Sequence, residues 1–176
     1  MMMQKLLLVL IPLFSTFITG DNLIEWSASR KLTWNDFKGS PDPNSAMIAL
    51  TNSNIKIELG FNEKTFEYSI RCGFHTEKSW VKMKTDYILN HEQRHFDITE
   101  IYARILEKSL KAYKFNGKTV EKDINKIYSD VMKDHVASQH TYDLETNHSI
   151  DSVQQHNWDN KIDSLLNVYK DYSDYK

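Results

Sequence analysis

Alternating apolar and polar residues mark the first part of the chain as β structure. Between about residues 47 and 74 the apolar positions recur at every second residue, with a polar interruption at residues 62–64. These apolar positions are Ile55, Ile57, Leu59, Phe61, Phe66, Tyr68, Ile70, Cys72 and Phe74. A period of two on both sides of a short polar turn predicts a half-buried β-hairpin. We expect further strands at residues 47–51 and 32–37.

The pattern becomes helical from about residue 85. Apolar positions then recur every three or four residues, which predicts one helix over about 86–113 and a second from after Thr119 to near His140. A third helix is expected over about 151–169, and residues 141–149 are expected to form a loop. Strands followed by helices predict an α+β fold.

The first twenty residues have the three-part layout of a secretory signal peptide. One positive charge, Lys5, precedes an apolar run over residues 6–18, and Gly20 supplies a small residue before the cleavage point. The run is shorter than the roughly 20 apolar residues of a spanning helix, although an uncleaved membrane anchor is the alternative interpretation. We therefore expect an exported protein, periplasmic or secreted, with no stable membrane anchor after cleavage. Residues 21–176 are expected to form a single domain.

Composition narrows the classes of function. Hydrophobic residues make up 40% of the chain and charged residues 26%, as in ordinary globular proteins. The formal net charge of −2 supplies no basic field, so we expect no nucleic-acid partner. The one cysteine, Cys72, lies in an alternating apolar run and is expected to be a core residue rather than a nucleophile. The sequence also holds seven histidines, and their placement carries the candidate chemistry.

That chemistry concentrates in one pentapeptide of the first predicted helix, His91-Glu92-Gln93-Arg94-His95. The order His-Glu-x-x-His is the zinc-site signature of many metallopeptidases. At 3.6 residues per turn, the two histidines lie about 40° apart around the helix and one turn apart along it. They can therefore converge on one Zn²⁺ ion per chain. Glu92 lies at the edge of the same face, where it can reach a water molecule and act as general base.

The neighbours of this motif predict which side of the helix is buried. The stripe that carries the histidines also holds Ile88, Ile98, Tyr102 and Ile105. The histidines are therefore expected to point into the protein. Thr99, one turn further on, is expected to hydrogen-bond a ligand histidine. Asp97 and Glu100 are expected to point away from the site, Glu100 into solvent.

A catalytic zinc site needs a third protein ligand, and the spacing alone leaves it open. The candidates after the motif are His135, His140, His148 and His156, with Asp130 and Asp134 behind them. His148 follows the second predicted helix in a loop, where ligands commonly lie. His135 and His156 are expected to be surface or hydrogen-bonded residues, whereas His140 stays open, including as a transition-state donor.

Three stretches of the chain resemble a bacterial family, domain of unknown function 922, described as predicted secreted zinc-dependent proteases. These stretches are residues 90–98 around the motif, residues 32–39 and residues 142–148. The resemblance extends to Gln155 and Trp158 beyond them. It implies that His91, His95 and His148 are the metal ligands and that Glu92 is the base. Arg94 and Ser149 stand where glycine is commonly expected in the family.

These features together predict an α+β, zincin-like domain. A mostly antiparallel N-terminal sheet would pack on a long active-site helix, followed by two further helices. We expect a zinc metallopeptidase acting on peptides or proteins, with an edge strand that aligns the substrate and with Tyr142 or His140 stabilising the oxyanion. Two alternatives are a zinc hydrolase of a non-peptide envelope amide and a non-catalytic binding module on a peptidase scaffold.

Overall fold

The predicted β-hairpin is present. The computed structural model describes residues 22–62 and 64–175, so the predicted signal peptide lies outside the described residues. Strands β3 (Ser53–Phe61) and β4 (Phe66–His75) pair antiparallel, with Ile55 opposite Cys72 and Ile57 opposite Ile70. The alternation of the sequence sets the two faces, because every second side chain of a strand points to the same side. One face packs into the core, and the other carries exposed Lys56, Glu58 and Arg71.

Three short strands complete two small antiparallel sheets. Strand β1 (Leu23–Glu25) pairs with β4, giving the order β1-β4-β3. Strands β2 (Ala49–Leu50) and β5 (Trp80–Val81) pair with each other. The strand expected at residues 47–51 is thus reduced to two residues.

The strand expected at residues 32–37 is wrong, because this segment contains one turn of 3₁₀ helix, η1 (Trp34–Asp36). The carboxylate of Asp36 accepts hydrogen bonds from the backbone N–H of Thr33 (2.7 Å) and from its hydroxyl (3.1 Å). It also pairs with Arg30 at 2.7 Å. These local bonds compete with an extended conformation and favour the turn.

Three helices follow the strands, as the sequence predicts. Helix α1 covers Asp86–Ala112, α2 covers Val120–Glu145 and α3 covers Ser152–Val168. The Thr85 hydroxyl caps α1 by accepting from the backbone N–H of Ile88 at 3.1 Å. The Asp151 carboxylate caps α3 by accepting from the backbone N–H groups of Val153 and Gln154. Two further 3₁₀ turns are η2 (Thr76–Lys78) and η3 (Lys170–Tyr172). None of the described helices is long and apolar enough to cross a membrane.

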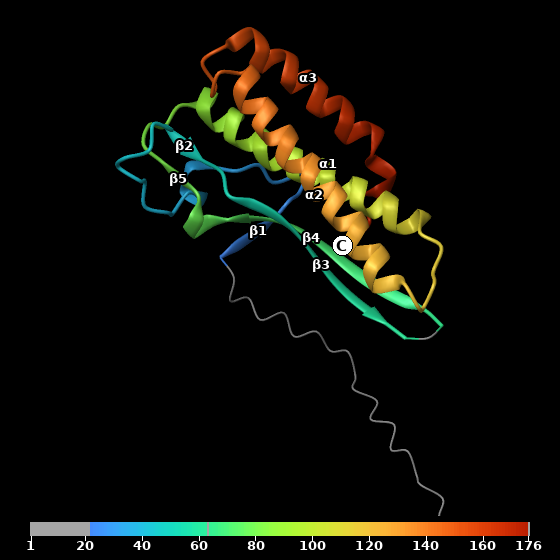
Figure 1. Cartoon of the computed structure of the whole chain (residues 1–176). Coiled ribbons are helices and arrows are strands. Elements are labelled where there is room, and N and C mark those ends of the chain that lie inside the picture. Colours follow the sequence, from blue (N-terminus) through green and yellow to red (C-terminus); the bar gives the residue numbers. More distant parts are fainter. Residues whose placement is uncertain (1–21, 63, 176) are drawn as a thin grey trace, which may run out of the picture.

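Helix α1 is the central element of this α+β fold. It packs against β3 and β4 on one side and against α2 and α3 on the others, and α3 lies farther from the hairpin (Figure 1). Phe74 of β4 and Phe96, Leu106 and Leu110 of α1 belong to the main apolar core. A second apolar cluster joins α1 to the other helices through Ile98, Ile101, Tyr142, Trp158 and Ile162.

Helix α1 is packed against strands and helices, so the exposure to solvent expected of Glu100 is wrong, whereas Asp97 points away from the two histidines of the motif, as expected. Asp97 and Glu100 are both 0% exposed. Asp97 accepts a hydrogen bond from the indole N–H of Trp26 at 2.8 Å. Glu100 pairs with Arg104 at 2.9 Å and accepts from the hydroxyl of Tyr175. Each buried carboxylate therefore has the polar partners that burial of a charge requires. Cys72 is buried in the core, as predicted.

Candidate metal centre

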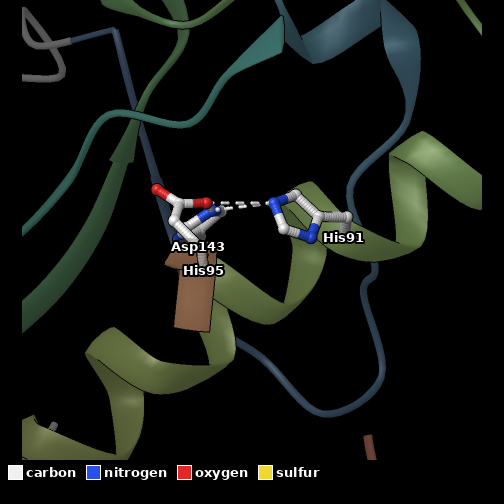
Figure 2. A group of neighbouring side chains, drawn as sticks. All are labelled: His91, His95 and Asp143. Carbon is white, nitrogen blue, oxygen red and sulfur yellow. Dashed lines mark hydrogen bonds and ion pairs between the residues drawn. The ribbon is translucent and has the colours of Figure 1, made fainter. Parts of the chain in front are cut away.

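Three side chains converge between the first half of α1 and the last turn of α2. His91 and His95 come from successive turns of α1, and Asp143 comes from α2 (Figure 2). The Nε2 atoms of the two histidines are 3.2 Å apart. Asp143 Oδ1 lies 3.2 Å from His91 Nε2 and 3.0 Å from His95 Nε2. This group can hold a metal ion.

The triangle of these three atoms has nearly the size of one face of a tetrahedral zinc site. Two ligand atoms that each lie about 2.0–2.1 Å from a tetrahedral Zn²⁺ ion are about 3.3 Å apart. The three separations here are 3.2, 3.2 and 3.0 Å. Two imidazole nitrogens and one carboxylate oxygen are also a donor set that zinc accepts in catalytic sites, with a fourth position left for a small molecule.

Gln155 of α3 fixes the orientation and tautomer of His91. Its amide nitrogen donates to the carboxylate of Asp159 (3.0 Å) and to the hydroxyl of Tyr142 (2.8 Å). Its amide oxygen therefore faces His91 Nδ1, at 2.9 Å. An amide oxygen can only accept, so Nδ1 carries the proton and Nε2 presents its lone pair to the centre.

Gln139 of α2 does the same for His95. Its amide nitrogen donates to the backbone carbonyl of His95 at 2.9 Å, and its amide oxygen lies 2.6 Å from His95 Nδ1. The lone pair on His95 Nε2 therefore also faces the centre. Partners of this kind on the outer ring nitrogen are typical of metal-binding histidines.

The electrostatics of the centre call for a positive charge between the three atoms. Burial alone would lower the pKa of His95, but the hydrogen bond with Asp143 and the negative charge of Glu92 raise it above its usual value. Burial alone would raise the pKa of Asp143, but its hydrogen bonds with His91 and His95 hold it far below its usual value. Lone pairs this close repel one another unless a proton or a metal ion lies between them. The centre thus favours a cation.

Glu92 shares a cavity with this group. The cavity has a volume of about 400 Å³ and is lined by residues 46–53, by α1 and α2, and by residues 148–150. Glu92 is 4% exposed, and its Oε2 atom is buried with no hydrogen-bond partner among the described residues. A buried carboxylate oxygen without a partner is costly and therefore calls for an explanation.

Residues 24–149 match the family described as "Bacterial protein of unknown function (DUF922)". The chain belongs to the DUF922 family. No curated protein and no solved structure matches it. The DUF922 match includes His91, Glu92, His95 and Asp143, whereas α3, which supplies Gln155, lies beyond it.

The DUF922-like stretch at residues 32–39 supports the motif helix from outside. The backbone N–H of Leu32 donates to the side-chain oxygen of Gln93 at 2.7 Å. Gly39 closes the other end, where its N–H donates to the carbonyl of Ser79 at 2.8 Å. A Cβ atom at Gly39 would lie 2.8 Å from the carbonyl oxygen of Glu77, so the close approach requires glycine.

His148, the third ligand implied by the DUF922 resemblance, lies beside the three-atom group but not within it. Its Nδ1 atom is 3.6 Å from Asp143 Oδ1, its side chain is 62% exposed, and it lines the cavity. It sits in a turn in which Asn147, His148 and Ser149 have φ angles of 48°, 51° and 70°. A metal-ligand role of His148 stays a prediction, and Asp143 is a second candidate that lies closer to both histidines.

The structure does not bring Tyr142 or His140 to the cavity. Tyr142 is 0% exposed, and its hydroxyl donates to the backbone carbonyl of His91 at 3.2 Å. Its ring stacks on the His91 imidazole, with centroids 4.6 Å apart. It therefore positions His91 from behind rather than facing a substrate. His140 is exposed on α2, outside the residues that line the cavity.

These placements follow from the true length of α2. The loop expected at residues 141–149 starts too early, because α2 continues to Glu145 and only residues 146–149 lie outside the helix. The inward face of α2 includes polar or aromatic residues, His135 and Tyr142, that continue the stripe begun by Ile124 and Val131. A search for apolar residues alone ends before His135. His135 and Tyr142 are nevertheless seven residues apart, which is about two helical turns.

The other residues considered as the third metal ligand are either buried beside the centre or exposed on the surface. His135 is buried, and its Nε2 atom lies 3.1 Å from the Thr99 hydroxyl. Thr99 donates to the backbone carbonyl of His95 rather than to its ring, so Gln139 takes the ring contact expected of Thr99. The other surface candidates are exposed: Asp130, Asp134 and, as expected, His156.

Sequence reasoning missed Asp143, Gln139 and Gln155 as parts of the centre. Gln139 and Asp143 are four residues apart, which puts them on one face once α2 is known to extend through both. Asp143 also lies within the stretch 142–148 that resembles the family. The signal was therefore present, but the early end assigned to the helix concealed it.

Proposed function

We propose that this chain is a secreted zinc-dependent peptidase with a zincin-like site. In this proposal His91, His95 and Asp143 hold the metal and Glu92 is the general base. One observation carries the proposal: two oriented imidazoles and a carboxylate converge at zinc-ligand spacing, beside a buried carboxylate oxygen without a hydrogen-bond partner among the described residues. The order of the fold, with strands before a helix that carries His-Glu-x-x-His, supports it.

The residues present fit Zn²⁺. Two imidazole nitrogens and one carboxylate oxygen can each offer a lone pair to the ion. A set of three protein ligands matches catalytic zinc sites, whereas closed structural sites have four. When bound at such a site, zinc lowers the pKa of water and polarises a carbonyl group. Gln155 and Gln139 keep the two imidazoles in the required tautomer throughout.

Glu92 handles the proton in this mechanism. Its buried Oε2 faces no competing donor among the described residues, so it can accept the proton of the attacking water. The same carboxyl group then delivers that proton to the nitrogen of the departing amine. In this proposal His148, which is exposed and lines the same cavity, binds the substrate carbonyl.

The β2 strand supports a peptide as the substrate. The N–H of Lys82 donates to the carbonyl of Ile48 at 2.7 Å, which turns the backbone of Ile48 and Leu50 toward β5. In an antiparallel ladder the residue between them, Ala49, turns its N–H and C=O the other way. Ala49 lines the cavity, so an extended peptide can add to this edge beside Glu92.

Replacement of the base tests the proposal. Glu92→Gln should retain zinc with an affinity within about threefold of the wild type, and lower peptide hydrolysis at least about 100-fold. Glu121→Gln, at an exposed position of α2, is the matched control and should leave both unchanged. Zinc content is measured by elemental mass spectrometry and hydrolysis with quenched fluorescent peptides. Equal hydrolysis by the wild type and Glu92→Gln would reject the mechanism, and zinc binding without any amide hydrolysis would favour a binding module.

A further inference from the structure

The cavity that holds the candidate centre has an apolar wall that the proposed chemistry does not use. Met47 and Ile48 precede β2 and are 41% and 39% exposed. Ile150, just after the His148 turn, is 73% exposed. All three line the same cavity as Glu92, as does buried Ile88 of α1. Large aliphatic side chains left in water around a concave site are typical of ligand contact surfaces.

The apolar wall itself carries no charged side chain. Of the lining residues in the described part of the chain, none is lysine or arginine, and the carboxylates are those of Glu92 and Asp143. A free α-carboxylate or an acidic side chain of a substrate would meet no cation from lysine or arginine there. A charged group buried against Met47, Ile48 and Ile150 would lose its water without gaining a polar partner from these side chains. The lining therefore favours an uncharged part of a peptide.

We propose that Met47, Ile48, Ile88 and Ile150 form a subsite for one bulky apolar side chain next to the scissile bond of an internal peptide segment. This inference rests on the proposed peptidase function and adds its substrate class. The β2 edge orients the peptide backbone, and the apolar wall accepts a side chain such as leucine or phenylalanine. Recognition by burial distinguishes side chains by size and polarity.

Hydrolysis of a peptide series tests the subsite. The zinc-loaded chain is given quenched peptides that differ at one position beside the cleaved bond: Leu, Phe, Gly or Asp. We expect kcat/KM for Leu and Phe to exceed that for Gly and Asp at least about tenfold. Ile48→Ser and Ile150→Ser should each reduce this ratio to below about threefold. Val153→Ser is the matched control, because Val153 is 68% exposed and does not line the cavity.

A binding measurement separates failure of the subsite from failure of the peptidase function. Isoleucine methyl signals of the metal-free chain are followed by NMR during titration with N-acetyl-leucinamide or with the α-amide of N-acetyl-aspartic acid. The leucine compound should shift the Ile48 and Ile150 signals, and the aspartate compound should not. Peptide hydrolysis without the Leu or Phe preference, or a preference that survives both serine variants, would overturn the subsite alone. Absence of all peptide hydrolysis would overturn the function, and the methyl shifts would then decide the subsite.

Discussion

Gln139 and His95 are joined by two hydrogen bonds, and the direction of the first determines the direction of the second. The amide nitrogen of Gln139 donates to the backbone carbonyl of His95 at 2.9 Å, which forces its amide oxygen toward His95 Nδ1 at 2.6 Å. Both atoms of one amide are thus used on one residue, and the imidazole has a single permitted tautomer. The proton on Nδ1 is what leaves Nε2 available to a metal.

Removal of that amide should weaken metal binding without removing a ligand. We expect Gln139→Ala to lower zinc affinity about 10–100-fold, because the ring of His95 is then free to rotate and change tautomer. Competition with a fluorescent zinc chelator measures the affinity. Gln154→Ala changes the same residue type on the partly exposed side of α3 and should bind zinc as the wild type does. Equal affinities of all three proteins would show that the amide does not orient the ring.

The third ligand can be assigned by two matched substitutions. Asp143→Ala should lower zinc affinity by more than about 100-fold, since it removes an atom that lies 3.0 and 3.2 Å from the two histidine nitrogens. His148→Ala should lower it less than about tenfold. The reverse order would make His148 the ligand, as the family resemblance implies, and Asp143 its neighbour at 3.6 Å.

The turn at residues 147–149 predicts a gain in stability. Ser149 has a φ of 70°, a left-handed conformation that costs an L-residue about 1–2 kcal/mol and glycine almost nothing. The greater backbone entropy that glycine loses on folding offsets part of this gain. We therefore expect Ser149→Gly to raise the free energy of unfolding in urea by about 0.5–1 kcal/mol. Ser149→Ala keeps a Cβ atom and should give no such gain; stabilisation by both would contradict the explanation.

Because the pKa of His135 is lowered, we expect the fold to lose stability in mild acid. Burial, aided by the positive charge of His95, lowers the pKa of His135 to about 4. The unfolded chain has a histidine pKa of about 6.5, so between these values it binds a proton that the folded chain does not. This contribution to stability is therefore lost as the pH falls through that window, by up to about 3 kcal/mol.

This prediction is tested with a variant that has no titratable side chain at position 135. The centre also titrates, because the lowered pKa of Asp143 adds loss in acid and the raised pKa of His95 opposes it. Urea unfolding at pH 7 and pH 4.5 is therefore compared between the wild type and His135→Gln, which should lose less stability in acid. His156→Gln removes an exposed histidine and should behave as the wild type. A drop of the same size in all three would exclude His135 as the cause.

The sequence predicted those parts of the fold in which burial and period agree. The hairpin has one apolar face, and α1 and α3 end within a residue or so of the expected positions. Prediction failed where polar residues are buried. Glu100 was expected in solvent but is fully buried, as is Asp97, because α1 is covered by strands and helices together. Two of their partners, Trp26 and Tyr175, are too distant in sequence for any local pattern to reveal.

The candidate site divides in the same way. His91, Glu92 and His95 were predicted because their spacing on one helix is a local property. Asp143 and the two orienting amides come from other elements, and only the packing of α2 and α3 on α1 brings them there. The expectation for Tyr142 shows the same limit: the residue lies at the site, but on the side of His91 that faces the interior.

The two histidines of the centre both lie on α1, but each is oriented by a glutamine from a different helix. Metal binding therefore depends on the packing of all three helices. His91 depends on Gln155 of α3, and His95 depends on Gln139 of α2. If α3 detaches while α1 and α2 stay packed, the motif is intact in sequence and still helical, yet one of its rings has lost its anchor. A chain whose last helix has not docked would on this basis hold a metal ion more weakly than the completed fold.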